Sequence, residues 1–270
     1  MTDIGKTAHL RRLTASPSGR ILTIALDHAP SYGLLAGIVD LPGLLRLIAG
    51  CRPDAIMLMK GTAARLYEPY AGRIPLILKC STLSPYHPAH DVAVASVGDA
   101  LRLGADAISM AVTFGCDTQP EHLRALAGLV GEAERVGLPV IAHAYPSGPG
   151  VPTSEQYGAE RVAYAARAVM ELGVDIVKTF FTGDAPSFSR VVEAAAPAIV
   201  VAAGGPRLDS EEAVLRMAAD AVEAGAGGIT FGRNVWQRTD IVATIGALKA
   251  IVHATAEPVI EGRDLAQAVR

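Results

Sequence analysis

Short apolar runs that recur along the whole chain restrict its fold more than any other feature of the sequence. There are eight of them, rich in Val, Ile and Leu and nearly continuous in apolar character, which is typical of parallel strands buried on both faces. Helical patterns fill most of the gaps. The expected strands are ILTIALD (21–27), DAIMLMK (54–60), IPLILK (74–79), DAISMAV (106–112), PVIAHAY (139–145), DIVKTFF (175–181), AIVVAAGG (198–205) and GGITFGR (227–233).

This alternation of strands and helices predicts an α/β fold, a (β/α)8 TIM barrel that forms one domain over residues 1–270. The connection between the second and third expected strands is short for a barrel unit. Residues 3–14 predict an extra N-terminal helix over the bottom of the barrel, and the tail after His253 has no strand partner. The clearest helical patterns lie at 120–137, 154–173, 209–225 and 239–255, and the first three end in a glycine that can close a helix.

The composition favours a globular protein that binds a small molecule. Half of the residues are apolar and 19% are charged, and the net charge of −3 with scattered arginines offers no basic surface for nucleic acid. Three cysteines without metal-binding spacing fit a reducing cytoplasm. No apolar stretch reaches the roughly 18 residues of a membrane span, and the N-terminus lacks the apolar core of a signal peptide.

Polar residues follow the expected strands at their carboxyl ends, where the active site of such a barrel gathers. Lysine is rare in this chain, with 5 lysines beside 19 arginines, yet three of the five fall at these strand ends. The candidates are Asp27, His28, Lys60, Lys79, Tyr145, Lys178, Gly204, Gly205, Gly232 and Arg233.

Lys178 is the candidate nucleophile, because apolar neighbours should lower the pKa of its amine and so raise the fraction able to attack a carbonyl. Tyr145 ends the neighbouring strand, about 4.8 Å away, and can transfer protons to the same substrate atoms. Asp27 lies across the barrel as an acid or base. The alternatives are that Lys178 caps a strand at the surface, that Lys60 or Lys79 is the nucleophile, and that Asp27 only caps a turn. Lys60 and Lys79 are also candidates to bind a phosphate or carboxylate of the substrate.

Glycines after the last two strands indicate a phosphate site. Gly204 and Gly205, and then Gly232 with Arg233, each precede a helical segment, so backbone N–H groups and a guanidinium can meet an anion there. The alternative is that these glycines only permit tight turns. A metal-dependent aldolase or isomerase is the rival interpretation, with His87, His90 and His143 as metal ligands. The two prolines of SPYHPAHD (84–91) predict a loop, however, and no Glu or Cys completes the set, so we predict no metal. A non-catalytic barrel that binds a sugar phosphate is a further alternative.

The chain resembles the archaeal-type class I fructose-bisphosphate aldolases and the 2-amino-3,7-dideoxy-D-threo-hept-6-ulosonate synthases. The matching segments are IGKTAHLRRL (4–13), ALDHAPSYG (25–33), HAYPSGP (143–149), VKTFFTGD (177–184), VVAAGG (200–205) and GRNVWQ (232–237). The resemblance implies a Schiff-base aldolase that needs no cofactor, with Lys178 as the imine-forming lysine, Tyr145 as the proton-transferring tyrosine and Asp27 as the acid. It also implies a phosphate site at the four residues named above, a role for His28 beside Asp27, and a homo-oligomer, since relatives assemble as large rings.

Two departures from the family pattern bear on the substrate. Ala29 stands where relatives commonly have Gly, and Ser147 stands where they often have Arg. Without that Arg, an aldehyde acceptor that carries no phosphate, such as aspartate semialdehyde, is favoured over glyceraldehyde 3-phosphate. The expected donor is a phosphorylated ketone such as dihydroxyacetone phosphate. The resemblance leaves fructose-bisphosphate cleavage as the alternative reaction.

Overall fold

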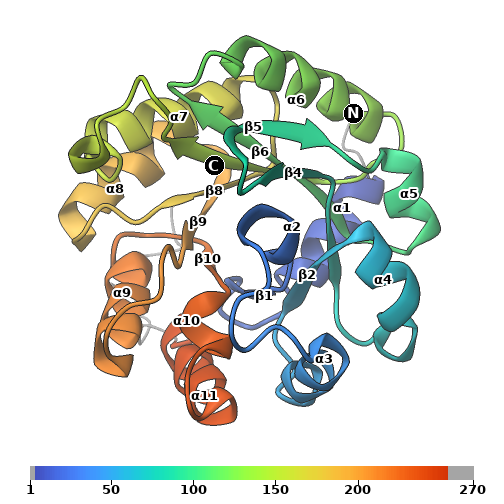
Figure 1. Cartoon of the computed structure of the whole chain (residues 1–270). Coiled ribbons are helices and arrows are strands. Elements are labelled where there is room, and N and C mark those ends of the chain that lie inside the picture. The colour runs from blue at the N-terminus through green and yellow to red at the C-terminus, as the bar shows by residue number, and fades with distance from the viewer. Residues whose placement is uncertain (1–3, 255–270) are drawn as a thin grey trace, which may run out of the picture.

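A closed barrel of eight parallel strands forms the centre of the molecule (Figure 1). The computed structural model describes residues 4–254. The order around the barrel is β1-β10-β9-β8-β7-β6-β3-β2, and every neighbouring pair is parallel. Each strand overlaps its expected range, so the predicted TIM barrel is confirmed. The strands are β1 (Ile21–Ala25), β2 (Ala55–Met59), β3 (Leu76–Lys79), β6 (Ala107–Phe114), β7 (Val140–Pro146), β8 (Ile176–Phe180), β9 (Ile199–Ala203) and β10 (Gly228–Phe231).

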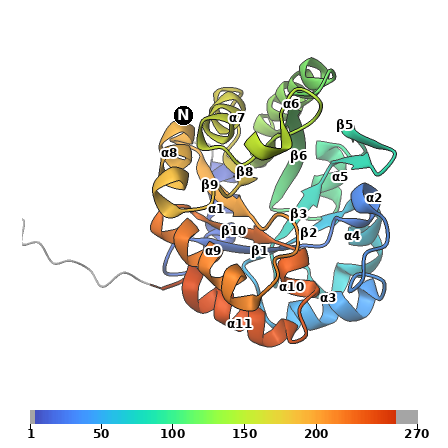
Figure 2. The ribbon, with the colours of Figure 1, turned by 60° about the vertical axis from the view of Figure 1, so that its left-hand side comes forward.

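Helices surround the barrel and bury their apolar faces against it (Figure 2). The four helical patterns expected from the sequence are confirmed as α6, α7, α9 and α11. The first three are followed by Gly137, Gly173 and Gly225, each with a positive φ. The outer helices are α3 (Leu41–Gly50), α4 (Lys60–Leu66), α5 (Val97–Arg102), α6 (Gln119–Glu134), α7 (Ala159–Glu171), α8 (Ala185–Ala195), α9 (Glu211–Glu223) and α11 (Ile241–Val252). The short helices α2 (Ala29–Tyr32) and α10 (Arg233–Trp236) follow β1 and β10.

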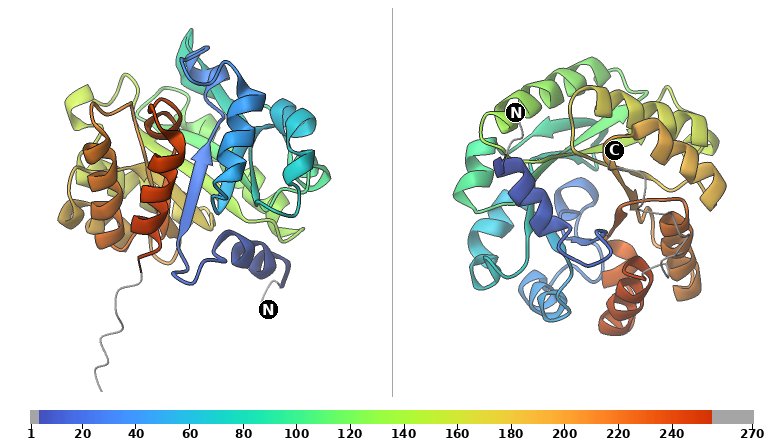
Figure 3. Two further views of the ribbon diagram at one scale, coloured as in Figure 1. Left: turned by 90° about the horizontal axis from the view of Figure 1, so that it is seen from below. Right: turned by 180° about the vertical axis from the view of Figure 1, so that it is seen from behind.

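The extra N-terminal helix, α1 (Ile4–Leu13), crosses the amino-terminal end of the barrel, as the right-hand view of Figure 3 shows. Its last residue, Leu13, is fully buried among the side chains that fill the barrel interior, and Leu10 packs against the same cluster. The prediction that this segment covers the bottom of the barrel is confirmed. The opposite, carboxyl-terminal end is left open for a site.

The short connection between β2 and β3 is a reduced barrel unit. It consists of the seven-residue α4 and a single 3-10 turn, Glu68–Tyr70, and both strands still pair in full register. None of the helices within residues 4–254 is long and apolar enough to cross a membrane. The tail after His253 falls in residues 255–270, outside the described part of the chain, apart from Ala254.

An antiparallel hairpin interrupts the alternation after β3. It is formed by β4 (Ser81–Ser84) and β5 (His87–Ala93), and it stands at the barrel rim beside α2 (Figure 2). The Ser31 hydroxyl of α2 lies 2.9 Å from that of Thr82 in the hairpin. The sequence SPYHPAHD was expected to be a loop because of its two prolines, and this expectation was wrong for His87–Ala93. The hairpin adds a wall to one side of the open end.

Candidate active site

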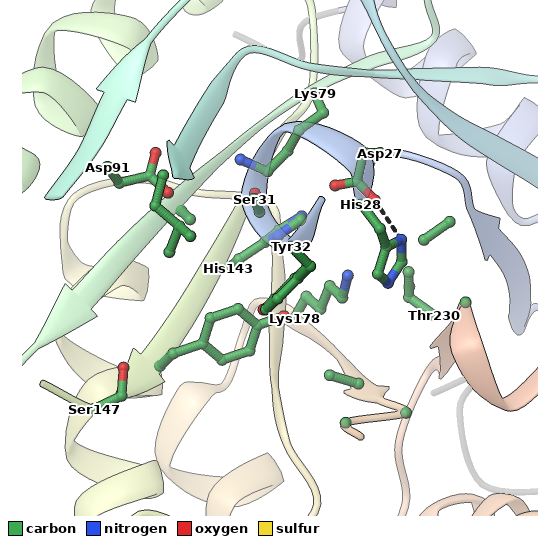
Figure 4. Close-up of a pocket in the computed structure, with 18 of the residues that line it drawn as sticks. Asp27, His28, Ser31, Tyr32, Lys79, Asp91, His143, Ser147, Lys178 and Thr230 are labelled. Carbon is green, nitrogen blue, oxygen red and sulfur yellow. Dashed lines mark ion pairs between the residues drawn. The ribbon is translucent and has the colours of Figure 1, made fainter. Parts of the chain in front are cut away.

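A cavity of about 430 Å³ opens at the carboxyl ends of the strands (Figure 4). The cavity lies at the end of the barrel where the strand-end rule predicts the active site. Side chains from β1, β3, β7, β8 and the segment after β10 line it, together with the hairpin. Nine of the ten candidates named from the sequence are among them: Asp27, His28, Lys79, Tyr145, Lys178, Gly204, Gly205, Gly232 and Arg233.

Lys178 lies in the middle of β8 with its amine inside the cavity (Figure 4). Only 7% of the residue is exposed, so the idea that it caps a strand at the surface is wrong. Burial lowers the pKa of its amine to about 8; Asp27 opposes this shift, and the nearby cations Lys79 and Arg233 add to it. About a tenth of the amine is then neutral at pH 7, which makes Lys178 a competent nucleophile.

Tyr145 and Lys178 project into the cavity from neighbouring strands. In the parallel pairing of β7 with β8, His143 is opposite Lys178, and Tyr145 lies two residues further along the same face. The Tyr145 ring stacks on Phe180 with ring centroids 4.5 Å apart. Burial raises the pKa of the Tyr145 phenol well above its ordinary value. The phenol therefore stays protonated at neutral pH, as a proton donor must.

Asp27 faces Lys178 from the other side of the barrel, three places away in the strand order. It is not the cap residue of α2, because that helix begins after His28. Burial acts to raise the pKa of the Asp27 carboxyl, but the positive charges of His28, when protonated, of Lys178 and of Lys79 hold it below its ordinary value. Asp27 is therefore a carboxylate at neutral pH and can accept a proton.

His28 is held as a neutral imidazole between Asp27 and Trp236. Its Nδ1 lies 3.5 Å from the Asp27 carboxylate, and its ring meets the indole of Trp236 edge-on at 5.2 Å. Burial lowers the pKa of His28 to about 4, and Lys178 and Arg233 add to this while Asp27 opposes it. The contact with Asp27 at neutral pH is thus one between a carboxylate and a neutral ring, so it is not an ion pair.

The segments after β9 and β10 form the glycine-rich side of the cavity. The Arg233 guanidinium donates a hydrogen bond to the Gly205 carbonyl at 2.9 Å and lies over the Tyr32 ring at 4.9 Å, while its buried Nε has no partner. The fully buried side chain of Asn234 ties down the first segment through the carbonyls of Gly204 and Pro206 and the N–H of Leu208. These bonds fix the position of the loop after β9. We call this loop, together with Gly232 and Arg233, the glycine-rich cradle, and its guanidinium can contact a phosphate.

Lys79 and Lys60, the rival nucleophiles, differ in their placement. Lys79 is buried and lines the cavity, where its ammonium donates to the hydroxyl of Ser81 at 2.7 Å and to the Ser81 carbonyl. Lys60 starts α4, pairs with Asp99 at 3.4 Å and does not line the cavity. The structure does not bring Lys60 to the predicted site, and we leave it out of the proposal below.

The histidines considered as metal ligands are not brought together. His87 and His90 lie on β5 and line a separate pocket formed by hairpin residues, whereas His143 is buried in the active-site cavity. Within residues 4–254 no three His, Cys, Asp or Glu side chains form a group that could hold a metal ion.

Comparisons with known proteins identify the family. Residues 21–238 match the family model described as DeoC/LacD family aldolase. The chain belongs to this family of aldolases. It is 38% identical to the 2-amino-3,7-dideoxy-D-threo-hept-6-ulosonate synthase of Halobacterium salinarum, over 96% of this chain and 95% of that protein. It is 32% identical to the 2-amino-4,5-dihydroxy-6-oxo-7-(phosphonooxy)heptanoate synthase of Streptomyces griseus, over 92% and 90%.

Solved structures of similar aldolases indicate the type of chemistry. An archaeal fructose 1,6-bisphosphate aldolase superimposes with a TM-score of 0.84 at 33% identity, covering 92% of this chain and 99% of that one. In another archaeal structure, with a TM-score of 0.83, 33% identity, and 92% and 100% coverage, the catalytic lysine is covalently bound to the carbinolamine intermediate of the substrate. The present aldolase is accordingly a class I, Schiff-base-forming enzyme.

Several residues that line the cavity of this aldolase were not found from the sequence. They are Asp91 and neighbouring hairpin residues, Ser31 and Tyr32 of α2, and Thr113, Phe180 and Thr230 at strand ends. Asp91 is the most unusual, because it is a carboxylate that is only 6% exposed. A weak signal was present in DVAVA (91–95), where β-branched valines alternate with alanines, but the prolines just before it obscured it.

Proposed function

We propose that this aldolase joins a phosphorylated ketone donor of the dihydroxyacetone phosphate type to an aldehyde through an imine on Lys178. The observation that carries the proposal is the buried Lys178 amine, which faces Tyr145 and Asp27 in one cavity. Lys79 is the weaker nucleophile, because its ammonium is already bound to Ser81. The reaction can run in either direction, as synthesis or as cleavage.

The neutral Lys178 amine attacks the donor ketone to give a carbinolamine, which loses water to leave an iminium ion. Asp27, ionised and on the far side of the cavity, takes a proton from the carbon next to the iminium and so forms the enamine. The enamine carbon then bonds to the aldehyde carbon, and the Tyr145 phenol donates its proton to the aldehyde oxygen. Water finally hydrolyses the imine and frees Lys178.

The donor phosphate binds at the glycine-rich side, against the backbone N–H groups of Gly204, Gly205 and Gly232 and the Arg233 guanidinium. The cradle fixed by Asn234 supports this role. His28 lies between this side and Asp27, and as a neutral imidazole it can hydrogen-bond a substrate hydroxyl.

An amino aldehyde, of which aspartate semialdehyde is the example, is the favoured acceptor. The names of the two synthases describe seven-carbon acids with a 2-amino group and a ketone at carbon 6, one of them with a phosphonooxy group at carbon 7. Such a product places an amino acid at the end remote from the ketone. Ser147 at the cavity wall provides no cation for an acceptor phosphate. Glyceraldehyde 3-phosphate is the second candidate, because the class 1 fructose-bisphosphate aldolase of Thermoproteus tenax is 35% identical over 87% of this chain and 90% of that protein.

We also propose a cytoplasmic homo-oligomer, the state that the family resemblance implies. Large apolar side chains at the surface, including Ile4, Leu34 and Tyr86, each more than three quarters exposed, provide contact area for subunits. Light scattering on the purified full-length chain tests this; a monomer at every concentration contradicts it.

Borohydride reduction with dihydroxyacetone phosphate, followed by peptide mass mapping, tests the imine. We expect one adduct, on Lys178, and none in the Lys178→Met variant. An adduct on Lys79 or Lys60 in the native enzyme, or no adduct under turnover conditions, overturns the assignment. The Lys60→Met variant is the matched control, because it removes a lysine that does not line the cavity, and it should be labelled like the native enzyme.

A further inference from the structure

The hairpin carries a buried carboxylate that the imine mechanism does not use. Asp91 lines the active-site cavity, is 6% exposed, and has one carboxylate oxygen, Oδ1, that is buried without a hydrogen-bond partner. None of the ion pairs described within residues 4–254 involves Asp91. A buried carboxylate oxygen without a hydrogen-bond partner is costly, so its presence at a ligand cavity points to a partner supplied by the ligand.

The backbone of Asp91 is fixed to the helix behind it. Its N–H donates a hydrogen bond to Nε2 of His122 on α6 at 3.1 Å, and the Thr118 hydroxyl donates to the carbonyl of Ala89 at 3.2 Å. His122 is 2% exposed, and its Nε2 can accept only when the ring is neutral. Burial lowers the pKa of His122, which favours that form. The carboxylate is therefore presented on an anchored strand.

Asp91 lies on the side of the cavity opposite the glycine-rich cradle. The hairpin follows β3, and β3 is four places from β9 in the eight-stranded barrel. Lys178 on β8 lies between the two sides, and Figure 4 shows Asp91 away from Asp27 and Thr230, with Lys178 between them. A donor with its phosphate at Arg233 and its ketone carbon at Lys178 thus directs the bond-forming carbon toward the hairpin, where the acceptor must bind.

We propose that the Asp91 carboxylate binds the ammonium group of an amino-aldehyde acceptor and so selects it over an acceptor that carries a phosphate. This inference rests on the proposed function, in which an aldehyde condenses with the enamine on Lys178. Lys79 lines the same cavity and extends toward the hairpin side in Figure 4. Its ammonium donates two hydrogen bonds to Ser81, so one of its three N–H groups is left to bind the carboxylate of the amino aldehyde. The two side chains complement an α-amino acid.

The negative charge of Asp91 disfavours glyceraldehyde 3-phosphate, the second candidate acceptor. The phosphate of glyceraldehyde 3-phosphate would meet the Asp91 carboxylate with one remaining N–H donor of Lys79 to offset the repulsion, since Ser147 is neutral. A carboxylate and a phosphate that approach in a poorly hydrated cavity repel each other strongly. Asp91 therefore separates the two candidate reactions.

The Asp91→Asn variant tests the proposal, because it removes the charge and keeps the size of the side chain. The enzyme is assayed in the condensation direction with dihydroxyacetone phosphate and either L-aspartate semialdehyde or succinate semialdehyde, which lacks the amino group. For the native enzyme we expect a preference for the amino aldehyde. For Asp91→Asn we expect kcat/KM with the amino aldehyde to fall at least about 30-fold, the lower range for loss of a buried charge partner, and the preference to disappear.

Two controls separate this inference from the function on which it rests. Asp117→Asn removes the same charge at an exposed position just after β6, and it should leave the preference unchanged. Borohydride trapping of the donor on Lys178 in the Asp91→Asn variant reports whether the site is folded. If trapping is lost in Asp91→Asn, the Asp91→Ser variant is assayed in its place. An equal loss with both acceptors, a preference that survives in the variant, or a native enzyme that prefers glyceraldehyde 3-phosphate overturns the role of Asp91. Trapping on Lys178 in those cases leaves the imine mechanism standing.

Discussion

Gly232 and His28 are packed so closely that the site admits no side chain at position 232. A Cβ built on Gly232 would lie 2.3 Å from Cε1 of the His28 imidazole and 2.9 Å from the carbonyl oxygen of Ala25. The glycine expected to bind phosphate therefore also decides where the imidazole beside Asp27 lies. This contact therefore links the proposed phosphate-binding side of the cavity to the side that holds Asp27.

The Gly232→Ala variant should displace His28 and lower both stability and activity. We expect a loss of about 1–3 kcal/mol in the free energy of unfolding, because the added methyl overpacks a filled site. Urea denaturation and kcat/KM measure the two effects. Combining the change with His28→Ala should recover part of the stability, and strict additivity of the two losses would show that the contact does not matter.

Lys178→Met should stabilise the protein near neutral pH while abolishing activity. The pKa of Lys178 is about 8 in the folded protein and near 10.5 in an ordinary environment, so folding disfavours the charged amine. This cost is fully present below pH 8 and disappears as pH rises from 8 to 10.5, where the unfolded chain also loses its proton. The variant should gain roughly 2–4 kcal/mol at pH 7, and this gain should shrink across that window. Urea denaturation at several pH values measures it.

The half-exposed Lys60 provides the matched control for this prediction. Lys60→Met removes a lysine from a surface pair with Asp99, and its effect on stability should stay within about 1 kcal/mol at every pH. Parallel pH profiles for Lys178→Met and the native protein would mean that burial does not shift this amine.

The barrel and the position of the side chains that we propose to react were predictable from the sequence, because both follow from simple regularities. Parallel strands buried on both faces leave continuous apolar runs, and the carboxyl ends of such strands must meet. Lys178 and Tyr145 were found by that rule, and their shared face follows from the two-residue period of a strand. No knowledge of side-chain contacts was needed.

The other features of the site depend on contacts between residues far apart in the sequence, which no local sequence pattern predicts. Lys60 follows β2 as expected, but α4 begins at that residue and its ammonium meets Asp99 outside the cavity. Asp91 was missed because the prolines in its stretch suggested a loop, while the hairpin is stabilised by pairing and by distant bonds to α6. The role of Asn234 comes from bonds to residues about 30 positions away.

Tyr145→Phe should lower turnover and leave stability almost unchanged. The variant loses the phenolic proton but keeps the ring that stacks on Phe180. A positioned acid typically contributes about 10²- to 10⁴-fold to the rate, so kcat should fall within that range while the melting temperature stays constant. Tyr164→Phe, at an exposed position on α7, is the control and should keep native turnover. Native kcat in Tyr145→Phe would remove the phenol from the mechanism.

Asn234→Ala should weaken binding of the phosphorylated donor more than it slows turnover. The side chain holds the carbonyls of Gly204 and Pro206 and the N–H of Leu208, so its loss frees the loop after β9 that forms the phosphate cradle. We expect KM for the donor to rise about tenfold or more and the free energy of unfolding to fall by about 1–3 kcal/mol, since buried polar groups lose their partners. Steady-state kinetics with varied donor, and inhibition by inorganic phosphate, measure the first effect.

The Asn234→Asp variant refines this last prediction. It keeps the acceptor for the Leu208 N–H but loses the donors to Gly204 and Pro206, and it adds a negative charge beside the expected phosphate. Its KM for the donor should therefore exceed that of Asn234→Ala, and inhibition by inorganic phosphate should weaken in parallel. If both variants lose stability while donor KM and phosphate inhibition stay native, Asn234 supports the fold alone, and the donor phosphate binds elsewhere in the cavity.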